Sequence, residues 1–168
     1  MGSIGKVAWS GLRLGWVRAD AQVINRLRSP KAVSDMATSA VSQMLALEIV
    51  DRYEEFVEAR VTTLRPSADL VVETLRNDLP DWTFAPVRGG LSVWAKLPDD
   101  ASATAFVQHA GRHGVLVASG RQFCAADVDC PNVRIPFTAD VDQLAEGLRR
   151  LVEAWRTFDR QPVAATVI

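Results

Sequence analysis

The chain has 168 residues, of which 48% are hydrophobic and 23% are charged, and its formal net charge is −1. These totals predict one globular domain or a compact lobe, exclude disorder over most of the length, and give no broad field to attract nucleic acid or an anionic membrane. Lys6, Arg13 and Arg18 interrupt the hydrophobic opening stretch, so neither a membrane span nor a cleavable signal peptide is predicted there, and we expect a cytoplasmic protein.

The first predicted elements are a short strand and a short helix. Residues 12–17 alternate in the manner of a strand with two different faces. Asp20 is a suitable N-cap for a helix that ends near Arg28. Ser29 followed by Pro30 predicts the start of the next helix, because proline is favoured at the first helical position.

Two longer helical patterns follow. Apolar residues recur at three- and four-residue steps between residues 33 and 47, which predicts a helix with one apolar face. Helical periodicity resumes at residue 51 and continues to about residue 79. Pro66 removes one backbone donor inside this second pattern, so we expect a break or kink near residues 64–67, with two helices or one bent helix.

Beyond Pro80 the pattern changes to strands separated by turns. The predicted order of elements is β, β, α, β, β, α. This order indicates the α/β class, and within it a small two-layer α+β domain in which helices pack against one sheet. Gly114 suits the left-handed position that ends a helix. The strands are predicted at 82–85, 91–97, 115–118 and 132–137, and the helices at 103–113 and from an N-cap at Thr138.

Lys6 is the first candidate functional residue. It follows a glycine and precedes an apolar run. A lysine held on a rigid turn among small and apolar groups can be partly neutral through desolvation, and the neutral amine condenses with aldehydes. The alternative is an ordinary solvated lysine. The stretch "GSIGK" is not a phosphate-binding loop, because the first glycine of that motif and the following Ser or Thr are absent.

Two arginines on predicted strands need anionic partners to offset their desolvation. Arg13 is flanked by leucines, and its partner is either a structural carboxylate or a ligand phosphate held by two hydrogen bonds. Arg134 alternates with Val133 and Ile135, so it faces away from the layer that they fill. Its partner is a substrate carboxylate, Asp140 or water.

The histidines and cysteines suggest no metal site. His109 and His113 have a spacing that can bind metal on a helix, but no third ligand is in register, so we interpret them as surface imidazoles. Cys124 and Cys130 are too few for a disulfide scaffold. We interpret them as reduced thiols, with a local disulfide or redox pair as the alternative.

The chain resembles the C-terminal part of a fold type I pyridoxal-phosphate aminotransferase domain. The resemblance lies in the order and the surroundings of Ser3, Lys6, Arg13 and Arg134. The stretches "GSIGKVAWSGLRLGWVRAD", "GGLSVWAKLP", "AGRHGVLVASG" and "NVRIPF", in this order, are most similar to the MocR subgroup of GntR-family bacterial transcription regulators. In that subgroup an aminotransferase-like domain follows a winged helix-turn-helix. The similarity extends over residues 2–158.

The resemblance implies a role for each of these four residues. Lys6 corresponds to the lysine that forms the internal aldimine with pyridoxal 5'-phosphate. Ser3 and Arg13 correspond to residues that hold the cofactor phosphate, and Arg134 to the arginine that pairs with the α-carboxylate of an amino-acid substrate or effector. Gly5 stands where many relatives have serine, which removes one hydroxyl from the site.

The resemblance also implies a division of the chain. Residues 1–28 would be a remnant of the large cofactor-binding domain, 29–79 the connecting helices, 80–158 the C-terminal small domain and 159–168 a flexible tail. Family members supply the residues that hold the pyridine ring from sequence upstream of the lysine, where this chain has only five residues. We therefore expect the back half of such a domain, with little activity alone.

Two functions follow from the resemblance. One is the effector-binding domain of a transcription regulator, which contacts DNA only through an N-terminal winged helix-turn-helix. The other is a transaminase that transfers amino groups between an amino acid and a 2-oxo acid, and a remnant without activity is a third reading. The amino-acid sequence around Lys6 favours the regulator. We expect a homodimer for the full-length parent and no membrane partner.

Overall fold

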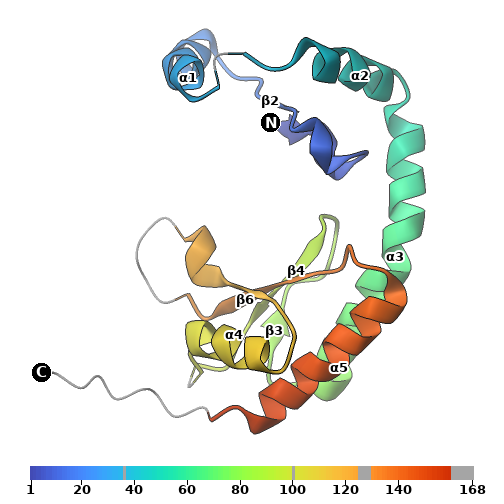
Figure 1. Cartoon of the computed structure of the whole chain (residues 1–168), viewed down its shortest axis with the longest axis vertical. Helices are drawn as coiled ribbons and strands as arrows, with labels where there is room; N and C mark the ends of the chain where they lie inside the picture. Colours follow the sequence, from blue (N-terminus) through green and yellow to red (C-terminus); the bar gives the residue numbers. More distant parts are fainter. Residues whose placement is uncertain (36, 100, 125–129, 160–168) are drawn as a thin grey trace, which may run out of the picture. The chain divides into compact units, whose positions relative to one another are not determined.

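The computed structural model describes residues 1–35, 37–99, 101–124 and 130–159 (Figure 1). The chain divides into two compact units, Met1–Thr63 and Leu64–Ile168, and the long helix α3 contributes residues to both. The flexible tail predicted over 159–168 lies outside the described residues except for Asp159. In the part of the chain that the structure describes, no helix combines the length and the hydrophobicity that crossing a bilayer requires.

The first unit consists of short strands and turns followed by helices (Figure 1). Its strands pair antiparallel with each other and with nothing else among the described residues. In chain order the elements are β1 (Gly2–Ser3), the 3₁₀ turns η1 (Ile4–Lys6) and η2 (Ser10–Leu12), β2 (Gly15–Trp16), α1 (Ala21–Ser34), α2 (Ala40–Asp51) and the start of α3 (Tyr53–Asp78).

The helix boundary predicted at Pro30 was wrong, and of the two alternatives at Pro66 the structure has the single helix. Pro30 lies inside α1, which runs on to Ser34, and Pro66 lies inside an uninterrupted α3. Each proline removes one amide donor, and the helix continues past it in both cases. In α3, Leu64 and Ala68 pack against the core of the second unit and hold the helix on either side of the proline.

The single helix predicted over 33–47 was also wrong. Its apolar pattern is divided between the end of α1 and the start of α2. The hydroxyl of Ser39 accepts a hydrogen bond from the amide of Ser42 at 3.4 Å, so α2 has its own N-cap.

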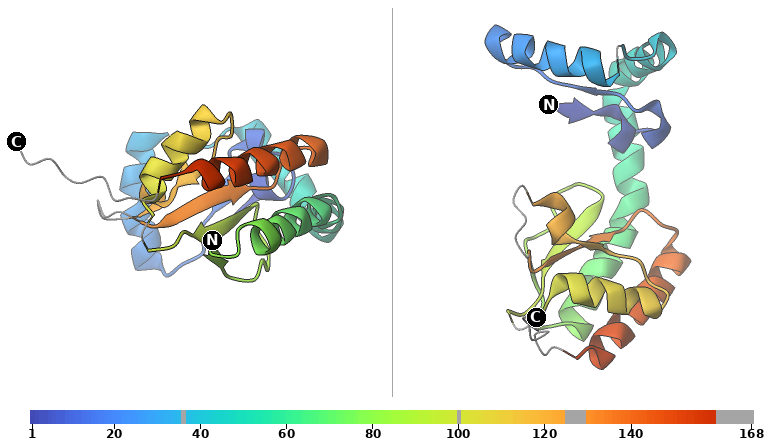
Figure 2. Two further views of the ribbon diagram at one scale, coloured as in Figure 1. Left: turned by 90° about the horizontal axis from the view of Figure 1, so that it is seen from below. Right: turned by 60° about the vertical axis from the view of Figure 1, so that its left-hand side comes forward.

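The second unit is a four-stranded antiparallel sheet with helices against one face (Figure 2). The strand order is β3-β4-β6-β5, and α4 packs against both α5 and the sheet. This confirms the predicted two-layer α+β arrangement and its order of elements. The elements are β3 (Thr83–Phe84), β4 (Ser92–Lys96), α4 (Ala103–Arg112), β5 (Ala118–Ser119), η3 (Gly120–Phe123), β6 (Asn132–Pro136) and α5 (Val141–Thr157).

Two predicted boundaries in this unit were wrong. The strand expected over 115–118 begins only at Ala118, because the amide of Val115 donates to the carbonyl of Ala110 and so belongs to the turn that ends α4. Helix α5 is capped by Asp140 rather than Thr138, since the Asp140 carboxylate accepts a bond from the amide of Asp142 at 3.1 Å.

Aromatic side chains fill the space between the sheet and the helices of the second unit. Phe106 on α4 is fully buried, and its ring meets those of Trp82, Trp155 and Phe158 edge to face at centroid distances of 5.4, 5.3 and 5.4 Å. Such pairs add to the stabilisation that burial of their area provides. This core fixes the sheet, and therefore the residues on its opposite face.

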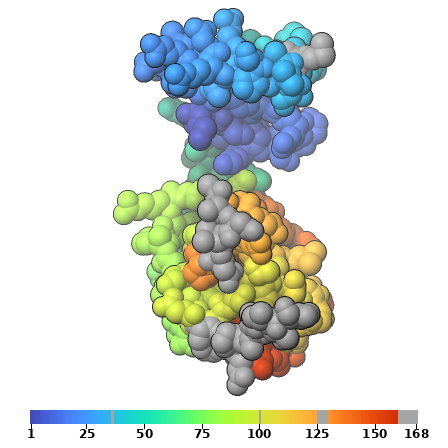
Figure 3. Space-filling model, turned by 90° about the vertical axis from the view of Figure 1, so that its left-hand side faces the viewer, coloured from blue at the N-terminus to red at the C-terminus, as the bar shows by residue number. Residues whose placement is uncertain are grey.

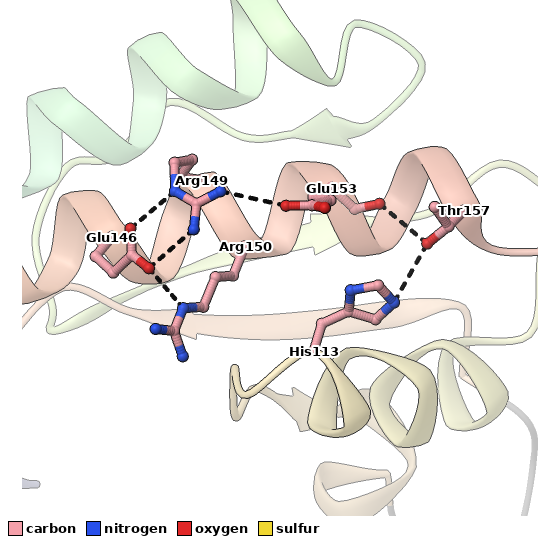
Figure 4. Close-up of polar contacts among 6 residues, drawn as sticks. All are labelled: His113, Glu146, Arg149, Arg150, Glu153 and Thr157. Atoms are coloured by element: carbon pink, nitrogen blue, oxygen red, sulfur yellow. Dashed lines mark hydrogen bonds and ion pairs between the residues drawn. The ribbon is translucent and has the colours of Figure 1, made fainter.

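Charged side chains form a network along the outer side of α5 (Figure 4). The Glu146 carboxylate accepts bonds from Arg149 Nε at 2.8 Å and from Arg150 Nε at 2.7 Å. Arg149 Nη1 also reaches Glu153 at 3.2 Å. Bonds from the two arginines lower the pKa of Glu146 from its usual 4.5 to about 2. The ionised form of Glu146 is thus favoured in the folded state.

Glu146→Gln is expected to lower the melting temperature at pH 7 by only about 1–2 °C, because the network is exposed. Since the folded-state pKa is depressed, the stabilisation is complete above pH 4.5 and is lost as the pH falls toward 2. The difference between wild type and variant should therefore narrow below pH 4.5 in thermal melts. Glu73→Gln, at an exposed position of α3, is the control. A difference that does not change with pH would contradict this account.

Candidate functional site

Three of the four predicted site residues lie on one hairpin of the first unit. Strands β1 and β2 pair antiparallel, and the amide of Ile4 donates to the carbonyl of Leu14 at 3.1 Å just inside that pair. The turns η1 and η2 fill the segment between the strands. Ser3, Lys6 and Arg13 therefore come from one closed segment of chain, part of whose surface is visible in dark blue in Figure 3.

Two buried side chains anchor this hairpin. Ile4 is 1% exposed and Leu12 is 5% exposed, and they form a small core with Ala46 and Ile49 of α2. The amides of Val7 and Ala8 both donate to the carbonyl of Ile4 at 3.0 Å, which tightens the backbone around it. The position of Lys6 relative to α2 is fixed by this core, although Lys6 itself is exposed.

Lys6 ends η1, and among the described residues its side chain has no hydrogen-bonding or charged partner. The described residues do not bury it, so they do not supply the apolar surroundings that the sequence suggested. The turn before it is tight, because a Cβ on Gly5 would lie 3.2 Å from Ser10 Cα. The same position would lie 3.7 Å from Ser3 Oγ, so the Ser3 hydroxyl is directed toward this turn.

Arg13 is not on a strand, which corrects the prediction. It follows η2 in the left-handed conformation with a φ of 49°, and its amide donates to the carbonyl of Ser10 at 3.3 Å. No other non-glycine residue of the described chain has a positive φ. The reason for the failure is that the buried Leu12 closes a 3₁₀ turn, and the chain must reverse before β2. Arg13 is exposed and has no ion pair among the described residues.

Arg134 lies in β6 on the sheet face opposite the core, as predicted. Its neighbours Val133 and Ile135 are 0% and 2% exposed, whereas Arg134 is half-buried on the other face. Its Nε donates to Ser92 Oγ at 3.0 Å, and its guanidinium carbon lies 5.7 Å from the centre of the Phe123 ring. None of the ion pairs among the described residues includes Arg134, so neither Asp140 nor another carboxylate neutralises it there.

The two groups of candidate residues belong to different units. Ser3, Lys6 and Arg13 lie in the first unit and Arg134 in the second. That all four contact one ligand stays a prediction.

Three residues around Arg134 were not predicted from the sequence, namely Ser92, Trp94 and Phe123. The alternation along β4 was a signal for the first two, because residues flanking the buried Val93 must face the same side as Arg134. Phe123 comes from η3, and no pattern in the sequence indicated its place.

The predicted bystander residues have mostly local contacts. His109 Nε2 lies 3.1 Å from Thr157 Oγ1, and desolvation and the nearby His113 lower the pKa of His109. Cys124 and Cys130 are free thiols, and a hydrogen bond with Cys130 raises the pKa of Cys124. Among the described residues, no group of three or more His, Cys, Asp or Glu side chains is placed to hold a metal ion.

Comparison with known proteins identifies the family. The family aminotransferase class I and II matches residues 1–153. The chain belongs to this family. Its α+β second unit and its opening hairpin match aminotransferase structures of fold type I, which confirms the predicted fold class. The chain is thus an aminotransferase-like domain, and no finer subgroup follows from the family match.

Individual relatives include both enzymes and regulators. The chain is 28% identical over 159 residues to aromatic-amino-acid aminotransferase 1 of Thermococcus litoralis. It is 28% identical over 155 residues to the HTH-type transcriptional regulator YdfD of Bacillus subtilis. Among solved structures, the α-aminoadipate aminotransferase LysN of Thermus thermophilus, complexed with N-(5'-phosphopyridoxyl)-L-leucine, superimposes with a TM-score of 0.80 at 27% identity.

The chain spans less than half the length of these relatives. The match with aromatic-amino-acid aminotransferase 1 covers 91% of this chain and 38% of that protein. The match with LysN covers 92% of this chain and 41% of that one, and the match with YdfD covers 90% and 32%.

Arg13→Gly is expected to stabilise the chain by up to about 1 kcal/mol, because the left-handed conformation is strained for a residue with a Cβ. The measurement is urea unfolding followed by circular dichroism. Arg18→Gly is the matched control, at an exposed arginine without positive φ, and it should leave stability unchanged or lower it slightly. Destabilisation by Arg13→Gly that exceeds the control would show that the guanidinium has a structural role instead.

Proposed function

We propose that the chain binds pyridoxal phosphate through Lys6, as part of the amino-acid-sensing domain of a MocR-type transcription regulator. The observation that carries the proposal is the anchored hairpin, which presents an amine, a hydroxyl and a guanidinium from Lys6, Ser3 and Arg13. The family match supports the cofactor, because solved relatives include an aminotransferase in complex with a pyridoxyl amino acid.

The chemistry of these residues suits the cofactor. A phosphate dianion requires cations and hydrogen-bond donors, and Arg13 and the Ser3 hydroxyl are of that kind. Both Lys6 and Arg13 are exposed cations without an ion pair among the described residues. The left-handed backbone of Arg13 costs free energy, and residues in such conformations gather at ligand-binding sites. The amine of Lys6 is the one group of the hairpin that can bond covalently to an aldehyde.

Arg134 would bind the carboxylate of the amino acid. Its Nε is occupied by Ser92, and its two terminal nitrogens face no carboxylate among the described residues. A guanidinium pairs with a carboxylate through two parallel hydrogen bonds. When bound, the cofactor supplies an electron sink for the bonds at the amino-acid Cα.

The regulator is preferred to the enzyme because the sequence around Lys6 is most similar to that of MocR-type regulators. Two HTH-type regulators of Bacillus subtilis are also among the relatives. In this proposal, amino-acid binding changes the affinity of a homodimeric parent for DNA through an N-terminal winged helix-turn-helix.

The second candidate is a transaminase, favoured by the enzyme relatives. There Lys6 Nζ would move the proton between the amino-acid Cα and C4′ of the cofactor. The coding sequence upstream of Met1 distinguishes the two. An in-frame winged helix-turn-helix supports the regulator, and a longer aminotransferase half without one overturns it in favour of the enzyme.

Reduction with borohydride in the presence of pyridoxal phosphate should attach a pyridoxyl group to Lys6, detected by peptide mass spectrometry. The chain has three lysines, and Lys31 and Lys96 are ion-paired with Asp35 and Asp99 at 2.8 and 2.7 Å. Lys6→Ala should therefore remove most of the label, whereas Lys31→Ala should retain it. The unreduced complex should be weak and lost on dialysis, because water reversibly hydrolyses the single imine bond that holds the cofactor. Equal labelling of Lys31 or Lys96 would overturn the proposal.

A further inference from the structure

The guanidinium of Arg134 is held in place by two neighbours on the outer face of the sheet. Ser92 Oγ accepts from its Nε at 3.0 Å, and the Phe123 ring lies 5.7 Å from its central carbon. The first contact fixes the plane of the fork, and the second supports it through a cation–π interaction. The terminal nitrogens are left to a ligand, already oriented, so less conformational entropy is lost on binding.

Two aromatic rings lie beside this guanidinium. Trp94 is opposite Arg134 in the β4–β6 register, and its ring meets that of Phe123 edge to face at 5.7 Å and 84°. Trp94 is 42% exposed and Phe123 is 54% exposed, although both are large and apolar. The core of the unit lies on the other sheet face, so burial there does not account for them.

The charges of this face favour one class of side chain over another. The next cation along the exposed face of β4, Lys96, is ion-paired with Asp99 at 2.7 Å. A second carboxylate on a ligand would thus have to displace Asp99, whereas an apolar or aromatic side chain would cover Trp94 and Phe123 and release water from them.

The geometry points to a subsite in which Arg134 binds the ligand carboxylate, Ser92 and Phe123 position the guanidinium, and Trp94 contacts an apolar or aromatic side chain. The inference rests on the proposed function in taking the ligand to be an amino acid. It deepens that function by naming the substrate or effector class, amino acids with aromatic or large apolar side chains.

The test is a titration of the whole chain without pyridoxal phosphate, followed by the NMR signals of Arg134 Nε–H and the Trp94 indole N–H. The probes are 3-phenylpropionate, propionate and 3-phenylpropan-1-ol. We expect 3-phenylpropionate to shift both signals and to bind several-fold more tightly than propionate, while the alcohol leaves the Arg134 signal unchanged. Equal affinity for the two carboxylates would overturn the inference.

Variants separate binding from positioning. Arg134→Met should abolish binding of both carboxylates, and Arg76→Met, at an exposed arginine of α3, is the matched control. Trp94→Ala should reduce the affinity for 3-phenylpropionate to that for propionate. Ser92→Ala should weaken both by the same factor and leave their ratio unchanged, which loss of folding would not do. A Trp94→Ala variant that keeps the preference would overturn the role of that ring.

The result is independent of the proposed cofactor chemistry, because no pyridoxal phosphate is present. If Lys6 is not labelled, the proposed cofactor site is wrong but the carboxylate subsite is not contradicted. If the titration fails, the carboxylate subsite is wrong but the labelling of Lys6 is not contradicted.

Discussion

The burial of Ile4 and Leu12 against α2 is the constraint on which the candidate cofactor residues depend. These two side chains flank the turns that contain Lys6 and precede Arg13, and they share a core with Ala46 and Ile49. Because only four of the described residues are buried in this core, each one has a large effect on the hairpin. The reactive side chains project from a segment whose own stability comes from its apolar residues.

In the second unit, alternation along two strands places the hydrophobic core and the candidate binding residues on opposite faces of the sheet. In β6 the buried Val133 and Ile135 pack against α4 and α5, and Arg134 between them faces the other side. In β4 the buried Val93 lies between Ser92 and Trp94 in the same way. One sheet therefore supplies a hydrophobic core on one face and a cationic, aromatic surface on the other.

The sequence alone predicted the elements with strong periodicity, and local signals were less reliable. The strands around Val93 and Val133 follow from period-two alternation, which depends only on one buried face. The helix boundary predicted at Pro30 was wrong, because a proline removes only one backbone hydrogen bond and α1 continues past it. The conformation of Arg13 depends on a chain reversal that no residue pattern encodes.

The site residues were predicted by resemblance to a family, and the family match supports that basis. The charge and the neighbours of Arg13 and Arg134 in the sequence were compatible with several partners for each. The contacts of Arg134 with Ser92 and Phe123 depend on the three-dimensional arrangement of β4, β6 and η3, which the sequence did not predict.

The central claim is that the hairpin of the first unit holds the cofactor through Ser3, Lys6 and Arg13. A crystal structure of the chain with N-(5'-phosphopyridoxyl)-L-phenylalanine tests it most directly. The account predicts the phosphate on Ser3 and Arg13, and the pyridoxyl carbon beside Lys6. A phosphate bound away from the hairpin, or a pyridoxyl group that does not contact Lys6, would contradict it.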